Sequence, residues 1–161
     1  INILNKQGWN IRESSIKIGL AKTKWPGRLE FRKWNNKNVL IDSAHNSSAA
    51  EVLARERENW INQEEGVYWI MGVQKKKDFL SIIQTLIKPV DRLLLVPVPN
   101  QISWKSCEIP DYIKFNRNYI YEFEDLKSAL QFLENLEVWP SCHPVIAGSI
   151  FLVSEFLKSI D

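Results

Sequence analysis

Short apolar runs alternate along this chain with longer segments whose apolar residues recur at helical spacing, and this alternation constrains the fold most. Continuous apolar runs of strand length are typical of strands that are buried on both faces. The runs lie within the expected strands 38–41, 67–72, 91–96, 119–123 and 144–147, and the helical segments cover 47–62, 79–87, 125–136 and the residues after 148. This order predicts an α/β fold, in which a mostly parallel sheet carries helices on both faces.

The first part of the predicted sheet is a hairpin. Residues 29–33 alternate apolar and charged side chains, as a half-exposed strand does, and Asn35 and Asn36 form a turn signal before the run at 38–41. One antiparallel strand is therefore expected in a sheet of about six strands. Residues 97–118 contain several prolines and predict a long irregular stretch.

The net charge, the lack of a long apolar run and the cysteine spacing exclude several classes of protein. The 161 residues include 21 basic and 19 acidic side chains, so a net charge of +2 gives no bulk attraction to nucleic acid or to an anionic membrane. No signal segment opens the chain, and no apolar run approaches the roughly 20 residues that span a bilayer. Cys107 and Cys142 lack metal-ligand spacing, which predicts free thiols in a cytoplasmic protein.

The run at 38–41 leads directly into Asp42-Ser-Ala-His45-Asn46, where chemistry is most expected. In open α/β sheets, ligands bind at the carboxyl ends of strands, and helix amino ends attract anions. Asp42 could accept a hydrogen bond from a ribose hydroxyl, but it could equally brace the loop or cap the next helix. His45 could be a hydrogen-bond partner, a general base, a phosphate contact or none of these. Asn46 is predicted to cap the helix.

Three other positions could hold an anion, and each also has an ordinary structural explanation. Arg28 follows a stiff Pro-Gly bend and could reach a charged group, or it could be a solvated surface charge. Ser149 follows Gly148 where the last strand meets the last helix, so it could hold a carboxylate or only cap the helix. Lys75–Lys77 precede a helix, and such basic runs are usually solvated.

Three short elements together resemble the folylpolyglutamate synthase and dihydrofolate synthase family of the Mur ligase superfamily. In that family WPGR, DGAHN and a late GS-aromatic element follow one another along the C-terminal domain. The matching elements are Trp25-Pro-Gly-Arg28, Asp42-Ser-Ala-His45-Asn46 and Gly148-Ser149-Ile-Phe. The resemblance covers nearly the whole chain, which departs from it at Ser43, where the family favours Gly, and at Ser47, where it favours Pro.

The resemblance implies that residues 23–161 form a Rossmann-like Mur ligase C-terminal domain, and that residues 1–22 are the remnant of a preceding ATPase domain with its linker. The chain would then be a fragment, which agrees with Ile1 at its start and with a helix-like opening closed by Gly8. A short helix is predicted over 11–21, with Asn10 as its candidate cap. No GxxxxGK(S/T) loop and no acidic cluster for Mg²⁺ occurs. The phosphate cradle for ATP and the magnesium ligands are therefore expected on an N-terminal P-loop ATPase domain of the same chain.

The resemblance also implies an ATP-dependent amide ligase that joins L-glutamate to folate or dihydropteroate through an acyl phosphate. It assigns Arg28 to the ATP phosphates and to catalysis, and Asp42 to the nucleotide ribose. It assigns His45 to catalysis and to the incoming glutamate, and Ser149 to glutamate. Lys77-Asp78 resembles a dipeptide of the family, which implies a minor role for Lys77 near the substrate. The domain alone is expected to be inactive, and the whole protein to be a monomer without nucleic-acid or membrane partners.

Two other functions remain open from the sequence. The missing P-loop permits a non-catalytic nucleotide- or protein-binding module with a Rossmann-like fold, and the sequence encoded upstream of Ile1 would separate this module from a ligase. The second is the C-terminal domain of a peptidoglycan Mur ligase. The element Asp42-Ser-Ala-His45-Asn46 is closer to the DGAHN of the folate enzymes than to the pattern expected of that class.

Overall fold

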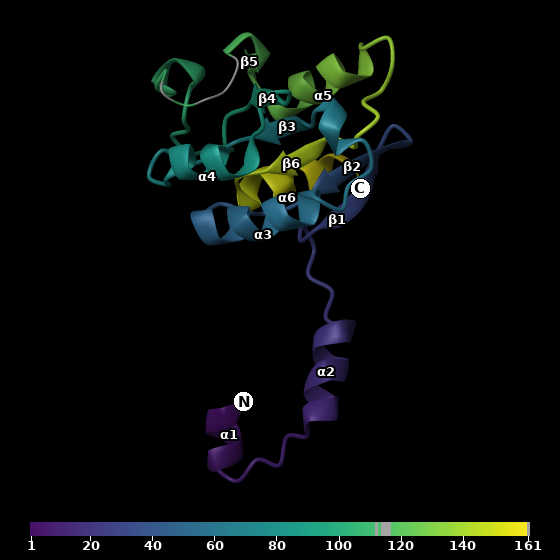
Figure 1. Ribbon diagram of the computed structural model, residues 1–161, viewed down its shortest axis with the longest axis vertical. Coiled ribbons are helices and arrows are strands. Elements are labelled where there is room, and N and C mark those ends of the chain that lie inside the picture. The colour runs from purple at the N-terminus through teal and green to yellow at the C-terminus, as the bar shows by residue number, and fades with distance from the viewer. Residues whose placement is uncertain (112, 114–116, 161) are drawn as a thin grey trace.

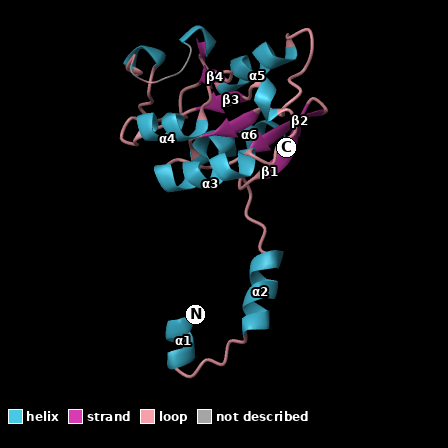
Figure 2. Cartoon of the chain, in the orientation of Figure 1, coloured by secondary structure: helices cyan, strands magenta, loops and turns pink. Residues whose placement is uncertain are grey.

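Six strands form one sheet in the order β1-β2-β6-β3-β4-β5 in the computed structural model, which describes residues 1–111, 113 and 117–160. The strands are β1 (Glu30–Trp34), β2 (Lys37–Ile41), β3 (Tyr68–Met71), β4 (Arg92–Leu95), β5 (Ile120–Glu122) and β6 (Val145–Ala147). Strand β1 pairs antiparallel with β2, and the other neighbouring strands pair in parallel (Figure 2). The predicted α/β fold, with one antiparallel strand, is confirmed.

Two pairs of helices cover the two faces of this sheet. Helices α3 (Ser47–Arg57) and α4 (Phe79–Leu86) pack on one face, and α5 (Leu126–Glu134) and α6 (Ile150–Ile160) pack on the other. Strand β3 shows how the alternation of side chains serves both layers. Trp69 and Met71 belong to the core beneath α3 and α4, while Ile70 belongs to the core beneath α5 and α6. Burial of each such side chain contributes about 1.5 to 3 kcal/mol.

The β1–β2 hairpin is turned by Asn35 and Asn36, as the sequence predicted. Both residues have left-handed backbone angles, with φ of 45° and 66°, and Trp34 pairs with Lys37 across the turn. A two-residue turn with positive φ at both positions matches the twist of a hairpin, and Asn tolerates it better than most residues. The local sequence therefore explains why β1 runs antiparallel.

Asn46 caps helix α3 as predicted, because its Oδ1 accepts a hydrogen bond of 2.9 Å from the Ala49 N–H. The predicted end of this helix at Asn62 is wrong, since α3 ends at Arg57. Asn62 instead has a left-handed φ of 58°, which a continuing helix does not allow. Arg57, the last residue of α3, is only 1% exposed, so the helix ends at a residue whose side chain is buried in the core.

A buried ion pair between Arg57 and Asp91 fastens α3 to the central strands. The guanidinium donates to both oxygens of the Asp91 carboxylate at 2.7 and 2.6 Å, and also to the Leu86 carbonyl at 2.7 Å. The carboxylate accepts three further hydrogen bonds, from Val67 N–H, Lys88 N–H and Trp69 Nε1. Asp91 is fully buried. The sequence analysis did not identify this pair.

His143 lies between two aromatic rings before β6. Its ring centroid is 4.8 Å from that of Phe31 and 4.9 Å from that of Trp60. Its Nε2 is shielded from solvent and has no hydrogen-bond partner among the described residues. Burial lowers the pKa of His143 from its ordinary value of 6.5, because the charged form loses its hydration.

The His143→Phe variant is expected to lose less stability than the wild type as the pH falls from about 7.5 to about 5. In the wild type, the unfolded chain takes up a proton on His143 at a higher pH than the folded chain, so acid favours unfolding below pH 6.5. Urea unfolding of both proteins at several pH values measures the difference. A difference in unfolding free energy that does not change with pH would contradict this assignment.

The N-terminal arm, residues 1–26, lies away from the domain (Figure 1). It contains α1 (Asn2–Lys6) and α2 (Glu13–Lys22), and none of its residues is buried. The helix predicted over 11–21 therefore forms as α2, but its predicted cap at Asn10 is wrong. The helix begins at Glu13, and the N-cap residue Arg12 makes no side-chain capping bond.

Other segments are irregular or form single turns. The stretch predicted to be irregular, 97–118, contains the 3₁₀ turns η2 (Ser106–Glu108) and the start of η3 (Arg117–Tyr119), and four of its positions, 112 and 114–116, lie outside the described residues. A further 3₁₀ turn, η1 (Gln63–Glu65), precedes β3.

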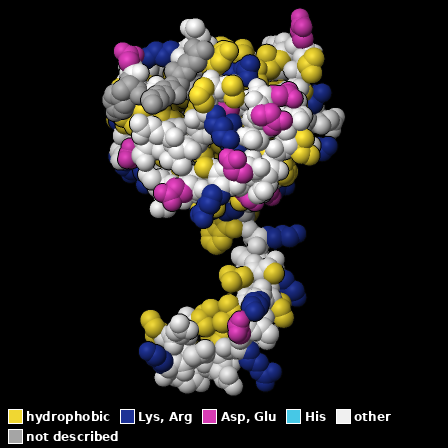
Figure 3. Space-filling view, viewed as in Figure 1, with side chains coloured by type: hydrophobic (Ala, Val, Ile, Leu, Met, Phe, Trp, Pro, Cys, Tyr) yellow, Lys and Arg dark blue, Asp and Glu magenta, His cyan; other side chains and the backbone are white. Residues whose placement is uncertain are grey.

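In the part of the chain that the structure describes, no helix combines the length and the apolar composition needed to cross a membrane. Basic and acidic side chains are interspersed on the face of the domain shown in Figure 3.

Candidate functional site

The carboxyl ends of β2 and β6 lie side by side, because these strands pair in parallel with Ile41 opposite Ile146. The N–H of Asp42 donates to the Ile146 carbonyl at 3.0 Å and extends this pairing by one residue. The segments that contain Asp42 and Ser149 therefore leave the sheet at the same edge. This edge is where open α/β sheets bind their ligands.

Asp42 joins the end of β2 to the segment that contains Arg28. Its Oδ2 accepts a hydrogen bond of 2.9 Å from Leu29 N–H, and its Oδ1 accepts one of 2.8 Å from Ala44 N–H. The Ser43 N–H also donates to the Gly27 carbonyl at 2.9 Å. Asp42 is only 7% exposed. Its carboxylate thus braces the loop, which is one of the roles that the sequence left open, and it fixes the backbone next to Arg28.

The bend before Arg28 requires glycine. Gly27 has a φ of +72°, and a Cβ added to it would lie 2.5 Å from Val153 Cγ1 on α6. Arg28 itself is exposed, and its guanidinium has neither a hydrogen bond nor an ion pair within the described ranges. Ser43, where the family favours Gly, lies outside the left-handed region. The serine therefore fits this loop without strain.

His45, Lys77 and Ser149 line one cavity of about 150 Å³ at the carboxyl edge, so the structure brings three of the predicted residues together. The remaining lining residues are Gln74, Gly148, Ile150 and Phe151. Nδ1 of His45 lies 2.8 Å from the Ser43 carbonyl, which can only accept a hydrogen bond. Nδ1 therefore carries a proton and donates to this carbonyl, and Nε2 is the ring nitrogen left for another partner.

Ser149 enters this cavity from the start of α6. Gly148 has a φ of +101°, and a Cβ there would approach Val73 Cγ2 to 2.8 Å and the Gly72 carbonyl oxygen to 2.9 Å. This close packing places Ser149, which is 4% exposed, at the amino end of the helix. Its Oγ accepts a hydrogen bond of 3.2 Å from Phe151 N–H. The hydroxyl thus acts as a cap, and its O–H is still available to donate to a ligand.

Lys77 is the member of the basic run that belongs to this cavity. Its backbone is held in place, since its N–H donates to the Gln74 carbonyl at 2.9 Å and its carbonyl accepts from Trp104 Nε1 at 3.1 Å. Its ammonium has no ion pair with any residue that the structure describes. From the sequence, Lys77 was predicted to have only a minor role near the substrate, and Gln74 was not predicted to belong to the site. The signal for Gln74 was its position just after β3, which pairs directly with β6.

The cavity suits a carboxylate. A lysine ammonium and the amino end of an eleven-residue helix both attract negative charge, and no acidic side chain is among the lining residues. The described residues contain no group of three or more His, Cys, Asp or Glu side chains that could hold a metal ion. The lining of this cavity is thus chemically compatible with a small anionic ligand.

Comparison with known proteins gives a family match over most of the domain. The family model described as dihydrofolate synthetase, C-terminal domain, matches residues 28–159. The dihydrofolate synthetase of Saccharomyces cerevisiae is 30% identical over 165 residues, which cover 92% of this chain and 38% of that protein. A dihydrofolate synthase/folylpolyglutamate synthase of Buchnera aphidicola is 28% identical, with coverage of 96% and 36%. The chain spans little more than a third of the length of these relatives.

Solved structures share the fold. A folylpolyglutamate synthase of Mycobacterium tuberculosis, complexed with ADP and AMPPCP, superposes with a TM-score of 0.73 at 20% identity, over 94% of this chain and 36% of that one. A bifunctional folylpolyglutamate synthase/dihydrofolate synthase with Mn, AMPPNP and L-glutamate bound gives a TM-score of 0.76 at 19% identity, over 99% and 37%. At these identities the likeness establishes the fold alone.

Proposed function

Because this chain belongs to the dihydrofolate synthetase C-terminal domain family, we propose that it is part of an ATP-dependent ligase that joins L-glutamate to a folate or dihydropteroate carboxylate. The observation that carries the proposal is the cavity that His45, Lys77 and Ser149 line together, with no acidic residue in its lining. A relative with the same fold was crystallised with L-glutamate and a nucleotide analogue, which supports the substrate class.

In this proposal the cavity holds the incoming glutamate. The Lys77 ammonium and the amino end of α6 bind a carboxylate of glutamate, and the Ser149 hydroxyl donates to the same group. His45 Nε2 accepts a hydrogen bond from the glutamate amine, because Nδ1 is occupied by the Ser43 carbonyl. These contacts fix the amine in one orientation, which lowers the entropic part of the barrier.

The remaining residues act on the phosphate side of the reaction. A carboxylate is a poor electrophile, so ATP supplies a phosphoryl group that turns the acceptor carboxylate into an acyl phosphate, with ADP as the leaving group. Arg28 stabilises the charge on the transferring phosphoryl group, and Asp42 holds the Arg28 loop and accepts a hydrogen bond from the ribose. The glutamate amine then forms the C–N bond as the C–O bond to phosphate breaks. His45 Nε2 takes the proton that the amine releases.

The proposal places the phosphate cradle and the magnesium ligands on an N-terminal P-loop domain, with residues 1–22 as the end of that domain. Two observations support this organisation. The arm exposes large apolar side chains, with Ile3 and Leu20 each 72% exposed and Trp9 64% exposed. The family match begins only at residue 28. Apolar groups of this size are usually covered by another surface, which a neighbouring domain would provide.

Ser149→Ala in the full-length enzyme is expected to raise the KM for glutamate about 5- to 150-fold, with little change in the KM for ATP. The range corresponds to roughly 1 to 3 kcal/mol for a lost hydrogen bond to a charged group. Steady-state kinetics with each substrate varied in turn measures it. Ser154→Ala, on the exposed side of the same helix, is the matched control. If Ser149→Ala leaves the glutamate dependence at the control value, Ser149 only caps α6.

A further inference from the structure

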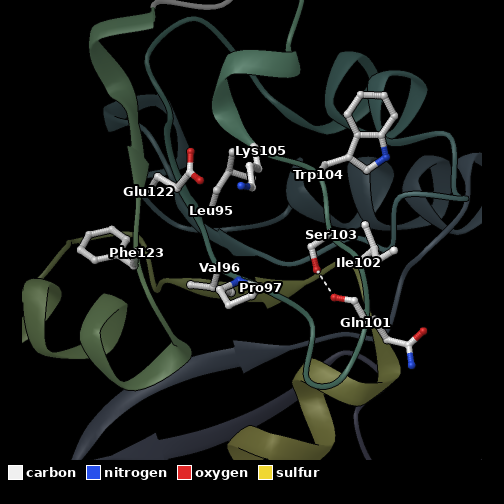
Figure 4. Close-up of a pocket in the computed structure, with 10 residues that line it drawn as sticks. All are labelled: Leu95, Val96, Pro97, Gln101, Ile102, Ser103, Trp104, Lys105, Glu122 and Phe123. Atoms are coloured by element: carbon white, nitrogen blue, oxygen red, sulfur yellow. Dashed lines mark hydrogen bonds between the residues drawn. The ribbon is translucent and has the colours of Figure 1, made fainter.

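Cavities occur at both ends of the parallel strands. At the carboxyl ends, besides the proposed glutamate cavity, a cavity of about 350 Å³ lies at β4 and β5, with Ile102 on one side and Phe123 on the other (Figure 4). Another cavity, here called the amino-edge cavity, has a volume of about 650 Å³ and is lined by residues from 31–38, 59–61 and 139–143. Lys37 begins β2 and His143 lies just before β6, so this cavity is at the amino ends of the strands. It shares no lining residue with the cavities at the carboxyl ends and is therefore separate from them.

Three aromatic rings that line the amino-edge cavity are fixed by their contacts with one another. The His143 ring meets Phe31 in an edge arrangement of 78° and also contacts Trp60. Trp60 in turn packs on Trp69, with ring centroids 5.9 Å apart. Trp69 is fully buried and donates from Nε1 to the Asp91 carboxylate. The rings are thus anchored to the buried core, and a rigid surface loses little conformational entropy when a ligand binds to it.

Much of the apolar surface around this cavity is open. Phe31 is 57% exposed and Ile61 is 79% exposed, and the Trp60 and Trp139 side chains are only partly buried. Small-molecule sites are typically hollows of about 300 to 1,000 Å³, lined mainly by apolar and aromatic side chains with a few polar groups. The amino-edge cavity has this size and this kind of lining.

The polar groups of the lining favour a ligand with a negative charge. Lys37 lines the cavity, its ammonium has no ion pair with any residue that the structure describes, and no acidic residue is in the lining. Burial lowers the pKa of His143, so this ring is uncharged near neutral pH and adds no second cation. The indole N–H groups of Trp60 and Trp139 have no hydrogen-bond partner among the described residues and are not shielded from solvent, so they can donate to a ligand.

We propose that the amino-edge cavity is a second ligand site, which binds a planar aromatic anion with about two fused rings and a single acidic group. The rings of the ligand pack against the Phe31 and Trp60 side chains, and its acidic group pairs with the Lys37 ammonium. The inference goes beyond the proposed function, because the cavity lies at the opposite end of the strands from the glutamate cavity. Binding here needs neither nucleotide nor glutamate.

The test titrates naphthalene-2-sulfonate into the full-length enzyme by calorimetry, with AMPPNP and L-glutamate present at saturation to occupy the proposed catalytic site. A ligand of this size is expected to bind with a Kd of about 1 mM or tighter. Lys37→Gln and Phe31→Ala should each weaken binding about 5-fold. Both side chains are exposed, so the variants should fold. Lys127→Gln, an exposed lysine on α5, is the matched control and should leave the Kd unchanged.

Two further measurements make the assignment specific. The neutral analogue naphthalene-2-sulfonamide should bind the wild type and Lys37→Gln equally, because it has no charge to pair with the lysine. In crystals soaked with 6-bromonaphthalene-2-sulfonate, the anomalous signal of bromine should lie in the amino-edge cavity.

The proposal would be overturned if the sulfonate did not bind, or if Lys37→Gln and Phe31→Ala bound it as tightly as the wild type. Binding that disappears when AMPPNP and L-glutamate are present would place the sulfonate at the catalytic site and would also overturn it. Bromine found only outside the cavity would have the same meaning. None of these results bears on the proposed ligase activity, which is measured separately.

Discussion

Asp91→Ala is expected to lower the free energy of unfolding by about 3 to 5 kcal/mol, because it leaves the Arg57 guanidinium buried without a counter-charge. The variant also removes the acceptor for Val67 N–H, Lys88 N–H and Trp69 Nε1. Typical domains have only about 5 to 15 kcal/mol in total, so this loss is a large share. Urea unfolding followed by circular dichroism measures it.

Two further variants make the test specific. Glu58→Ala breaks the surface pair with Lys88, where the N–O distance is 3.0 Å, and should cost less than about 1 kcal/mol. The double variant Arg57→Met/Asp91→Ala removes the uncompensated charge and should recover part of the lost stability. If Asp91→Ala costs no more than Glu58→Ala, the buried pair does not hold α3 to the sheet.

Arg28→Ala in the full-length enzyme is expected to slow ligation about 100-fold while leaving the melting temperature nearly unchanged. Arg28 is exposed and packs little, whereas a contact to the transferring phosphoryl group contributes several kcal/mol to the transition state. Rates at saturating substrates and thermal melts of the same samples measure the two effects separately.

Matched substitutions define what Arg28 does. Arg55→Ala removes another exposed arginine, on α3, and should leave the rate unchanged. Arg28→Lys keeps the charge but not the planar fork, so only part of the rate should return. A melting temperature that falls in proportion to the rate in Arg28→Ala would instead make Arg28 a structural residue of the loop that Asp42 braces.

The sequence by itself determined the class and order of the elements. Strand and helix periodicities are local properties, so the alternation of buried runs with amphipathic segments was enough to predict the α/β sheet. The Asn35-Asn36 turn and the Asn46 cap were also predictable, because both depend on the backbone preferences of one or two residues. The resemblance of three short elements pointed to the family that the later comparison established.

Only the tertiary structure decided which distant residues meet. Arg57 and Asp91 are 34 residues apart and look like solvated charges in the sequence, yet they form the buried pair. Asp42 was expected to contact a ligand or to brace the loop, and in the structure its carboxylate accepts a hydrogen bond from Leu29 N–H next to Arg28. Lys77 and Gln74 line one cavity with Ser149 because β3 pairs with β6, although the two strands are far apart along the chain. Strand order is set by how the helices cover both faces of the sheet, and no local pattern encodes it.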